Sequence, residues 1–313
     1  MEYDKIILVL KMDLSYYMLG ALGNAAKPTG LKAVQSMEEH IMSSRAIGIF
    51  DSGLGGLTVA RELEMLLPRE SLIYFGDTGR APYGGRSKET LIRFGRQNIE
   101  FLMGFDVKLI VAACGTISAV GLPRLKQEYD IPLFGIIDSG ARAAALATSN
   151  GRIGIIATQA SISSGAYQSA VGEIDRQLYI KAQACPRFVT LAEAGRFKPS
   201  DPEVMEAVRE YLEPVKKEGV DTLLLGCTHY PIMEQAIRQY MGDDVTLVSA
   251  GSAAALELVQ YLSEKKLCVQ DDAPVQPRYY TSGSSEAFVK TAELFFGTGL
   301  KVSAVAPFSY GDS

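Results

Sequence analysis

The sequence predicts an α/β fold with two pseudo-symmetric domains, each a mostly parallel sheet flanked by helices, and a candidate active site in the cleft between them. Short apolar runs that end in Gly, Asp or Cys alternate with amphipathic stretches, which is typical of βαβ units. A length of 313 residues is enough for two such domains, each with its own core. The chain also repeats part of its own pattern, which favours two related units.

Strands are predicted wherever a short run rich in Ile, Val, Leu, Phe and Tyr stands between turn residues. In chain order the runs are AIGIF at 46–50, SLIYFG at 71–76, VKLIVAA at 107–113, LFGII at 133–137, RIGIIA at 152–157, DTLLLG at 221–226, VTLVS at 245–249 and RYYTS at 278–282.

Helices are predicted where longer amphipathic stretches lie between these runs. Asp201 followed by Pro202 fits an N-cap and a first helical position, Pro231 also fits a first helical position, and Gly242 fits a helix end. The predicted helices span residues 57–67, 88–103, 202–218, 231–241, 252–266 and 285–296.

The internal repeat relates two cysteines. IGIFDSGLGG from position 47 returns loosely as IGIIATQASISSG from position 153, and the strand that leads into CGT at Cys114 returns as the strand that leads into CTH at Cys227. Ligands of such sheets bind beyond the carboxyl ends of the strands, so two facing units place these cysteines on opposite walls of one cleft. The alternative is a chance likeness, because all βαβ units resemble one another.

We assign residues 45–138 plus 247–305 to a first lobe, which carries Cys114, and residues 139–246 to a second lobe, which carries Cys227. Residues 1–44 do not follow the alternation, although 6–10 fits an extra strand. A mispredicted start, an added segment and a regulatory arm all fit this segment, and we assign it no chemistry.

Charge and cysteine usage exclude several classes of protein. With 31 basic and 36 acidic residues the net charge is −5, which favours neither nucleic acid nor an anionic membrane as a partner. The four cysteines form no CxxC pair or Cys/His cluster, so no metal is expected. The longest uncharged stretch near the N-terminus, 14–26, is too short to span a bilayer, and we expect a cytoplasmic protein with free thiols.

Several catalytic motifs are incomplete. DSGLGGLT has Thr58 where a dinucleotide-binding loop needs its third glycine, and no G-K-[ST] follows. Neither Cys114 nor Cys227 has the C-x5-R spacing of a thiol phosphatase. The histidines are His40 and His229, and no G-x-S-x-G elbow accompanies them as a serine hydrolase would require.

The two matched thiols remain as the candidate chemistry. Cys114 in VAACGT and Cys227 in LLLGCTHYP each stand where a strand gives way to a turn and a helix. A helix N-terminus lowers the pKa of a thiol from its ordinary value of about 8.5, which predicts a usable base near neutrality. A small buried hydrophobe is the alternative for any single cysteine, and we assign it to Cys185 and Cys268.

Polar residues at other strand ends are predicted to converge on the same cleft. Asp51 and Asp77 are also suited to capping or turn roles, and Tyr83 is also suited to covering the core. The converging residues are Asp51, Ser52, Asp77, Tyr83, Gly84, Thr158 and Ser161.

The motifs DSGLGG, GDTGRAPYG, strand–CGT and GCTHYP, in this order and spacing, resemble those of the glutamate racemases in the aspartate/glutamate racemase family. The resemblance covers roughly residues 45–300. It implies a cofactor-independent enzyme that interconverts L- and D-glutamate, with two cysteines as acid and base on opposite faces of Cα. It also implies a homodimer and a role in supplying D-glutamate for peptidoglycan.

The resemblance assigns roles to individual residues. Cys114 deprotonates D-glutamate with help from Asp51, and Cys227 deprotonates L-glutamate with help from His229. Glu193 matches an acidic residue near the cleft, and Asp77 is a further supporting residue. The implied substrate-binding positions are Asp51, Ser52, Tyr83, Gly84, Gly115, Thr116, Thr158, Ser161, Thr228 and His229.

The match has departures that leave alternatives open. Gly115 stands where the family usually has Asn, which removes one side-chain hydrogen bond to the substrate. IIDSG at 136–140 replaces a Glu-Pro-Gly turn, and Ser161 replaces a Thr but keeps the hydroxyl. The alternatives are an aspartate or hydantoin racemase, a non-catalytic amino-acid-binding or inhibitory relative, and a thiol hydrolase.

Overall fold

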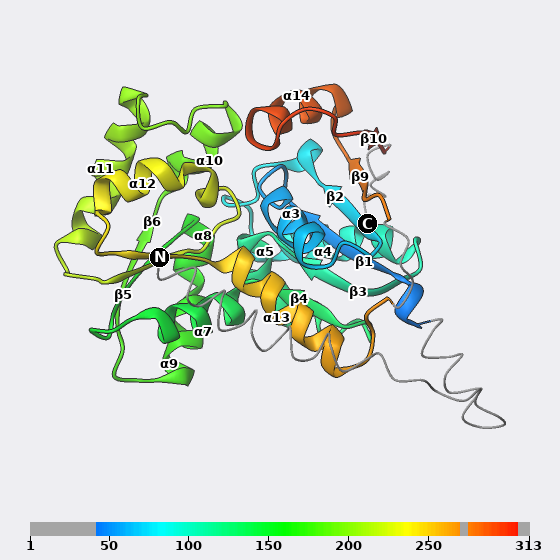
Figure 1. Cartoon of the computed structure of the whole chain (residues 1–313), viewed down its shortest axis with the longest axis horizontal. Coiled ribbons are helices and arrows are strands. Elements are labelled where there is room, and N and C mark those ends of the chain that lie inside the picture. The colour runs from blue at the N-terminus through cyan, green and yellow to red at the C-terminus, as the bar shows by residue number, and fades with distance from the viewer. Residues whose placement is uncertain (1–41, 270–274, 306–313) are drawn as a thin grey trace. The chain divides into compact units, whose positions relative to one another are not determined.

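The computed structural model describes residues 42–269 and 275–305. These residues form two sheets of parallel strands, each with helices on both faces (Figure 1). A compact unit begins at Ser43. The predicted strand at 6–10 and nearly all of the segment 1–44 lie outside the described residues.

The first sheet has six strands in the order β10-β9-β2-β1-β3-β4, and every neighbouring pair is parallel. Its strands are β1 Ala46–Asp51, β2 Leu72–Gly76, β3 Val107–Ala112, β4 Leu133–Gly135, β9 Arg278–Thr281 and β10 Val302–Ala304.

The second sheet has four parallel strands in the order β6-β5-β7-β8. Its strands are β5 Arg152–Ala157, β6 Tyr179–Ala184, β7 Thr222–Leu225 and β8 Thr246–Ser249. The order β2-β1-β3-β4 in the first sheet has the same topology, with β1 matching β5 and β3 matching β7. The predicted pseudo-symmetry is therefore confirmed at the level of strand order.

Helices cover both faces of each sheet because alternate residues of a buried parallel strand point to opposite faces. On the first sheet, one face packs against α3 Leu57–Leu66, α13 Ala250–Glu264 and α14 Ser285–Phe296, and the other against α4 Lys88–Met103, α5 Gly115–Val120 and α6 Leu122–Leu125. On the second sheet, one face packs against α10 Pro186–Glu193, α11 Pro202–Lys216, α12 Glu234–Met241 and the 3-10 helix η2 Tyr230–Met233. The other face packs against α7 Ile137–Ala147, α9 Ala166–Ile174 and the first turns of α13.

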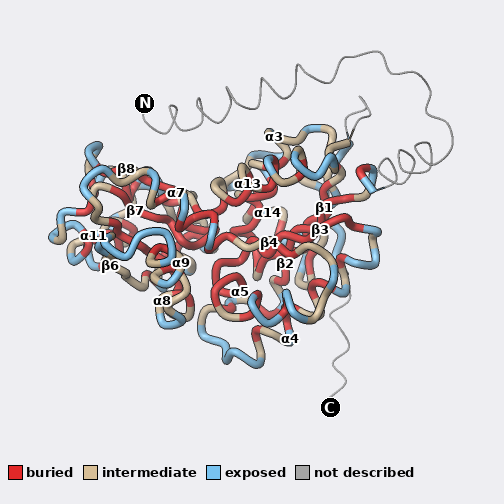
Figure 2. Tube along the Cα trace, turned by 90° about the horizontal axis from the view of Figure 1, so that it is seen from below, coloured by how far each residue is buried: buried red, intermediate tan, exposed pale blue. Residues whose placement is uncertain are grey.

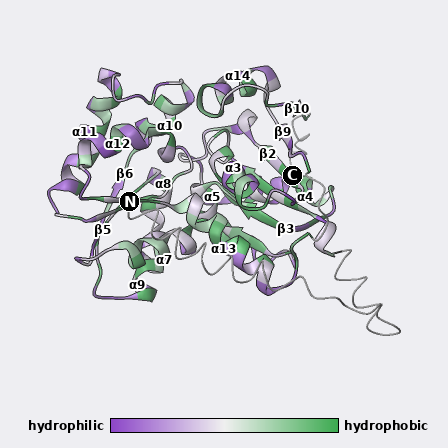
Figure 3. Ribbon diagram, viewed as in Figure 1, coloured by the Kyte–Doolittle hydropathy of each residue, from purple (hydrophilic) through white to green (hydrophobic). Residues whose placement is uncertain are grey.

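Buried residues run through the strands of both sheets (Figure 2), and hydrophilic residues are frequent on the covering helices such as α11 and α12 (Figure 3). Two shorter elements remain: the helix α8 Gln159–Ser164 after β5 and the 3-10 helix η1 Thr78–Arg80 after β2. Both follow strand ends, where the predicted site residues lie.

The eight predicted strands between residues 46 and 282 and the six predicted helices all form, with ends that differ by a few residues, and the cap signals at Asp201 and Gly242 are confirmed. The Asp201 carboxylate accepts a hydrogen bond from the Glu203 N–H at 3.0 Å, and Gly242 ends α12 with a φ of 97°. Pro231 is the second residue of η2, the 3-10 helix that precedes α12. The run at 133–137 is a strand only to Gly135, because Ile137 already opens α7.

The helices α7 and α13 link the two sheets at equivalent places. α7 follows β4 of the first sheet but packs on β7 and β8, whereas α13 follows β8 and packs on α3. The two helices contact each other, and a Cβ on Gly140 would lie 2.8 Å from the Ala250 Cβ.

Two of the predicted lobe boundaries fall within secondary-structure elements, and the division into lobes stays a prediction. The boundary at 246/247 falls inside β8, whose residues Thr246 to Ser249 all pair with β7. The boundary at 138/139 falls inside α7, which belongs with the second sheet.

Candidate active site

The carboxyl ends of four central strands meet between the two sheets. The hydroxyl oxygens of Thr116, after β3, and Thr158, after β5, are 3.0 Å apart. The Thr228 hydroxyl, after β7, donates to Asp51 Oδ2, at the end of β1, at 3.2 Å. The internal repeat makes these two contacts equivalent, and they bring Thr116, Thr158, Thr228 and Asp51 to one position between the sheets.

Cys114 lies at the N-cap of α5 and is almost fully buried. Burial raises the pKa of its thiol to about 12, and the neighbouring charges of Asp51 and Cys227 act in the same direction. Hydrogen bonds from the Ile117 N–H and the Ser52 hydroxyl oppose the rise without cancelling it. The prediction of a lowered pKa is therefore wrong for Cys114, because desolvation outweighs the N-terminus of a six-residue helix.

Cys227 has a different partner. Its Sγ is 3.9 Å from His229 Nδ1, and His229 Nε2 is 3.2 Å from Glu193 Oε1. Burial alone lowers the pKa of His229, but Cys227, Glu193 and Asp51 together raise it to about 10. The imidazole is therefore protonated at neutral pH, and its positive charge lies beside the Cys227 Sγ.

Asp51 connects the loop after β1 to the loop that carries Cys227. It is fully buried, its Oδ1 accepts from the Gly53 N–H at 2.9 Å, and its Oδ2 accepts from Thr228. Burial raises its pKa, while His229 and these hydrogen bonds counteract the rise. The turn role and the site role considered for Asp51 are thus compatible, because one carboxylate oxygen serves each.

A chain of three hydroxyls continues from Thr116 through Thr158 to Ser161. Thr158 Oγ1 is 2.9 Å from Ser161 Oγ, and it also accepts from the Ser161 N–H as the N-cap of α8. A Cβ on Gly84 would lie 3.5 Å from the Thr158 Cβ, so the loop after β2 also reaches this point. Such hydroxyl and backbone groups are able to hold a carboxylate.

Asp77 and Tyr83 belong to a neighbouring hydrogen-bond network. They lie outside the thiol centre, by which we mean Cys114, Cys227 and the residues that contact them. Asp77 accepts hydrogen bonds from Arg80 Nε at 2.5 Å, from the Ser282 hydroxyl at 2.6 Å and from the Tyr83 hydroxyl. Asn98 Nδ2 also donates to the Tyr83 oxygen, at 3.2 Å. The Tyr83 hydroxyl is therefore engaged within the first lobe, which leaves its backbone for any substrate contact.

Gly115 meets the opposite lobe directly. A Cβ at this position would lie 2.6 Å from the carbonyl oxygen of Gly226, the residue before Cys227. Side chains do not tolerate such an approach to a backbone atom, so in this arrangement the position requires glycine.

Residues 60–258 match the sequence profile of the Asp/Glu/hydantoin racemase family. The chain belongs to this family. It is 42% identical to a glutamate racemase of Oceanobacillus iheyensis over 253 residues, which cover 80% of this chain and 92% of that protein. The prediction of an amino-acid racemase, an isomerase, is confirmed.

Solved structures of relatives share the fold. A glutamate racemase isoform from Bacillus anthracis has a TM-score of 0.80 at 40% identity, covering 84% of this chain and 98% of that chain. A glutamate racemase from Francisella tularensis, solved in complex with D-glutamate, has a TM-score of 0.78 at 33% identity, covering 86% and 100% of the two chains.

Two site neighbours were not predicted from the sequence. The Thr58 hydroxyl, at the start of α3, lies 3.3 Å from the Thr228 carbonyl oxygen, to which it donates. The Tyr74 hydroxyl, on β2, donates to the Gly53 carbonyl at 2.7 Å and so supports the loop after β1. The position of Thr58 two residues after DSGLGG was a signal for the first, whereas Tyr74 is indistinguishable from a core aromatic in sequence.

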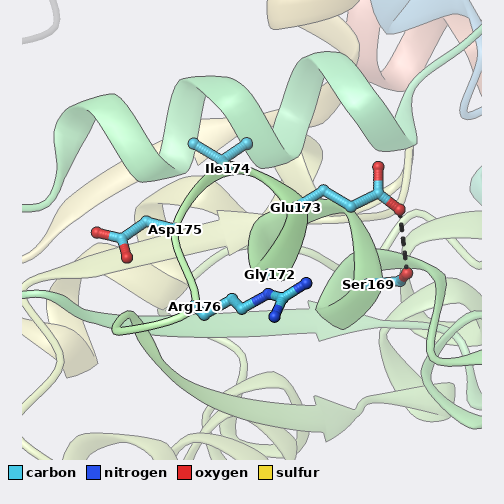
Figure 4. Close-up of a pocket in the computed structure, with 6 residues that line it drawn as sticks. All are labelled: Ser169, Gly172, Glu173, Ile174, Asp175 and Arg176. Atoms are coloured by element: carbon cyan, nitrogen blue, oxygen red, sulfur yellow. Dashed lines mark hydrogen bonds between the residues drawn. The ribbon is translucent and has the colours of Figure 1, made fainter.

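A surface depression beside α9 is separate from the thiol centre (Figure 4). Within it the Ser169 hydroxyl donates a hydrogen bond to Glu173 at 3.4 Å. None of the predicted site residues lines this depression. Over the part of the chain that the structure describes, no cluster of three His, Cys, Asp or Glu side chains is placed to hold a metal ion. Among the same residues, no helix combines the length and apolar character that crossing a membrane requires.

Proposed function

We propose that the chain is a cofactor-independent glutamate racemase that interconverts L- and D-glutamate by proton transfer at Cα between Cys114 and Cys227. The supporting observation is a pair of buried thiols on facing strand ends in contrasting environments. Cys227 lies beside a protonated imidazole, whereas Cys114 has a pKa of about 12 and carries its proton. A single racemisation event needs one thiolate as the base and one thiol as the acid.

Stereochemistry explains why two groups are needed. The enantiomers present their Cα hydrogen to opposite sides, so inversion through a planar carbanion requires a base on one wall and an acid on the other. In the L-to-D direction Cys227 takes the Cα proton and Cys114 delivers a proton to the other face. In the reverse direction the two cysteines exchange roles.

The polar residues around the thiols support an amino-acid substrate. Thr116, Thr158, Ser161 and Thr228 offer hydroxyls from both lobes, and backbone N–H groups at strand ends supply further donors for carboxylates. The similarity to a relative solved with D-glutamate favours glutamate as that substrate. Both cysteines are at most 5% exposed, so we propose that the lobes separate to admit it.

The resemblance of the motifs further supports a homodimer in the cytoplasm that supplies D-glutamate for peptidoglycan. The acidic balance of the chain supports neither nucleic acid nor membrane as a partner.

Incubation of the purified protein with L-glutamate in D2O, without pyridoxal phosphate, tests the proposal. We expect circular dichroism to decay to zero while deuterium enters Cα, because the proton returned to the product comes from solvent-exchanged thiol. A parallel incubation with aspartate distinguishes an aspartate racemase. Absence of inversion with either amino acid would contradict the proposed function and favour a binding protein.

The raised pKa of His229 predicts the behaviour at high pH. Because this pKa is about 10, the imidazolium persists at neutral pH and is lost as pH rises through that value. We expect kcat/KM for L-glutamate to fall over the same range. Glu193→Gln removes one of the groups that raise this pKa. The fall in kcat/KM of this variant should therefore begin roughly one pH unit lower than in the wild type.

The pH dependence of kcat/KM, which reports groups of the free enzyme, checks this expectation. Glu210→Gln is the matched control, because Glu210 pairs with Arg187 on the outer surface of the same lobe. Superimposable profiles for the wild type and Glu193→Gln would show that the Glu193–His229 contact does not set the charge on His229.

A further inference from the structure

Gly226, the residue before Cys227, is held by hydrogen bonds to both of its backbone polar groups. The Gly226 carbonyl oxygen accepts a hydrogen bond from the Tyr167 hydroxyl at 3.1 Å, and the Gly226 N–H donates to the Ile156 carbonyl at 2.8 Å. On its other side the same oxygen faces Gly115 of the first lobe, where a Cβ would approach to 2.6 Å. The orientation of the Gly226–Cys227 peptide therefore depends on the Tyr167 hydroxyl in one lobe and on Gly115, which has no side chain, in the other.

Tyr167 is suited to hold this position. It is fully buried near the start of α9, where its ring belongs to the core between the second sheet, α7 and α9. A Cβ on Gly226 would lie 2.7 Å from the Tyr167 Cε2, so the ring rests directly against the peptide. Burial raises the pKa of Tyr167 well above its ordinary value, and the phenol therefore remains a donor.

We propose that Tyr167 is a positioning residue for Cys227, holding the Gly226 peptide so that the thiol faces the substrate carbon, with Gly115 leaving space for the carbonyl. The inference rests on the proposed function for its chemical meaning. When Cys227 takes the proton of L-glutamate, a C–H bond breaks and an S–H bond forms; the S–H bond of Cys114 then breaks as a new C–H bond forms on the other face of Cα. Loss of the Tyr167 hydrogen bond should slow only the transfer at Cys227, since small displacements of a reacting group slow its step strongly.

Tyr167→Phe tests the inference by removing the hydroxyl and keeping the ring. We expect kcat/KM to fall about 10-fold, equally in both directions because the enantiomers have equal free energy. Substrate deuterium at Cα reports which transfer has slowed. The isotope effect on kcat/KM should rise with L-[2-2H]glutamate, whose proton Cys227 takes, and fall with D-[2-2H]glutamate, whose proton Cys114 takes.

Two further variants sharpen the result. Gly115→Ala displaces the same carbonyl from the opposite side, so it should shift the isotope effects in the same sense, and the double variant should lose less than the product of the single losses. Tyr240→Phe is the matched control, because its hydroxyl bonds to Glu213 on the outer surface of the lobe. It should leave both isotope effects unchanged.

A measurement that needs no turnover separates this inference from the proposed function. Mass spectrometry of chains treated with iodoacetamide gives the alkylation rates of Cys227 and Cys114. In Tyr167→Phe the Cys227 rate should rise several-fold relative to Cys114, because the released loop opens the thiol. An unchanged ratio, or isotope effects that move equally for both enantiomers, overturns the positioning role, whereas failure of the wild type to racemise overturns only the proposed function.

Discussion

Replacing either Cys114 or Cys227 by serine is expected to lower kcat for glutamate racemisation by about 10³-fold, because a hydroxyl is a far weaker base than a thiolate at neutral pH. The loss should be accompanied by one-sided exchange. In Cys114→Ser, Cys227 still removes and returns a proton on the L face, so L-glutamate takes up deuterium without inversion. In Cys227→Ser, only D-glutamate should exchange.

NMR of the Cα proton together with circular dichroism in D2O measures exchange and inversion separately. Cys268→Ser is the control, because Cys268 lies after α13, apart from the strand-end loops, and racemisation should be retained. Racemisation within a few-fold of the wild type in both site variants would exclude the two-thiol mechanism. A trapped covalent acyl intermediate on one cysteine would instead indicate a thiol hydrolase.

Lys108→Met is expected to reduce the free energy of unfolding by ~4 kcal/mol, which corresponds to a fall in Tm of roughly 10 °C. Lys108 and Glu70 form an ion pair with Nζ and Oε2 2.5 Å apart and side chains that are 0% and 2% exposed. The ammonium also donates to the Ser43 and Leu267 carbonyls, each at 2.7 Å. The substitution leaves a buried carboxylate without its counter-charge and two carbonyls without this donor.

Thermal and urea unfolding of three variants checks the argument. Lys217→Met removes the same group from an exposed pair with Glu213, so it should leave the unfolding midpoint nearly unchanged, because solvent screens this pair. The double variant Lys108→Met/Glu70→Leu should recover much of the loss, because no unpaired charge then remains buried. Equal stabilities of Lys108→Met and Lys217→Met would refute the structural role of the buried pair.

The Lys108 ion pair also illustrates what sequence patterns leave undetermined. Lys108 interrupts an otherwise apolar strand, and nothing nearby in the sequence indicates that Glu70 and the end of α13 converge on it. Its partners lie far apart along the chain, so only the folded arrangement identifies the charge as paired.

Missed elements have local causes. The strand β6 is an edge strand with no fully buried residue, so YIKAQA shows neither a continuous apolar run nor a clear alternation. The helix α7 contains many alanines, which give little hydrophobic contrast between its faces, and its first residues continue the apolar run of β4. Each signal was too weak because packing against neighbours, rather than local preference, decides these segments.

The sequence by itself determined the βαβ alternation, the internal repeat and the positions of Cys114, Cys227, Asp51 and His229 at strand ends, because periodicity and motif spacing are local properties of the chain. The tertiary structure decided the electrostatics and the supporting contacts. Burial raised the pKa of Cys114 instead of lowering it, Glu193 came within 3.2 Å of His229, and the Tyr83 hydroxyl was engaged by Asp77. Desolvation and cross-lobe hydrogen bonds depend on which distant segments meet, and only the fold brings those segments together.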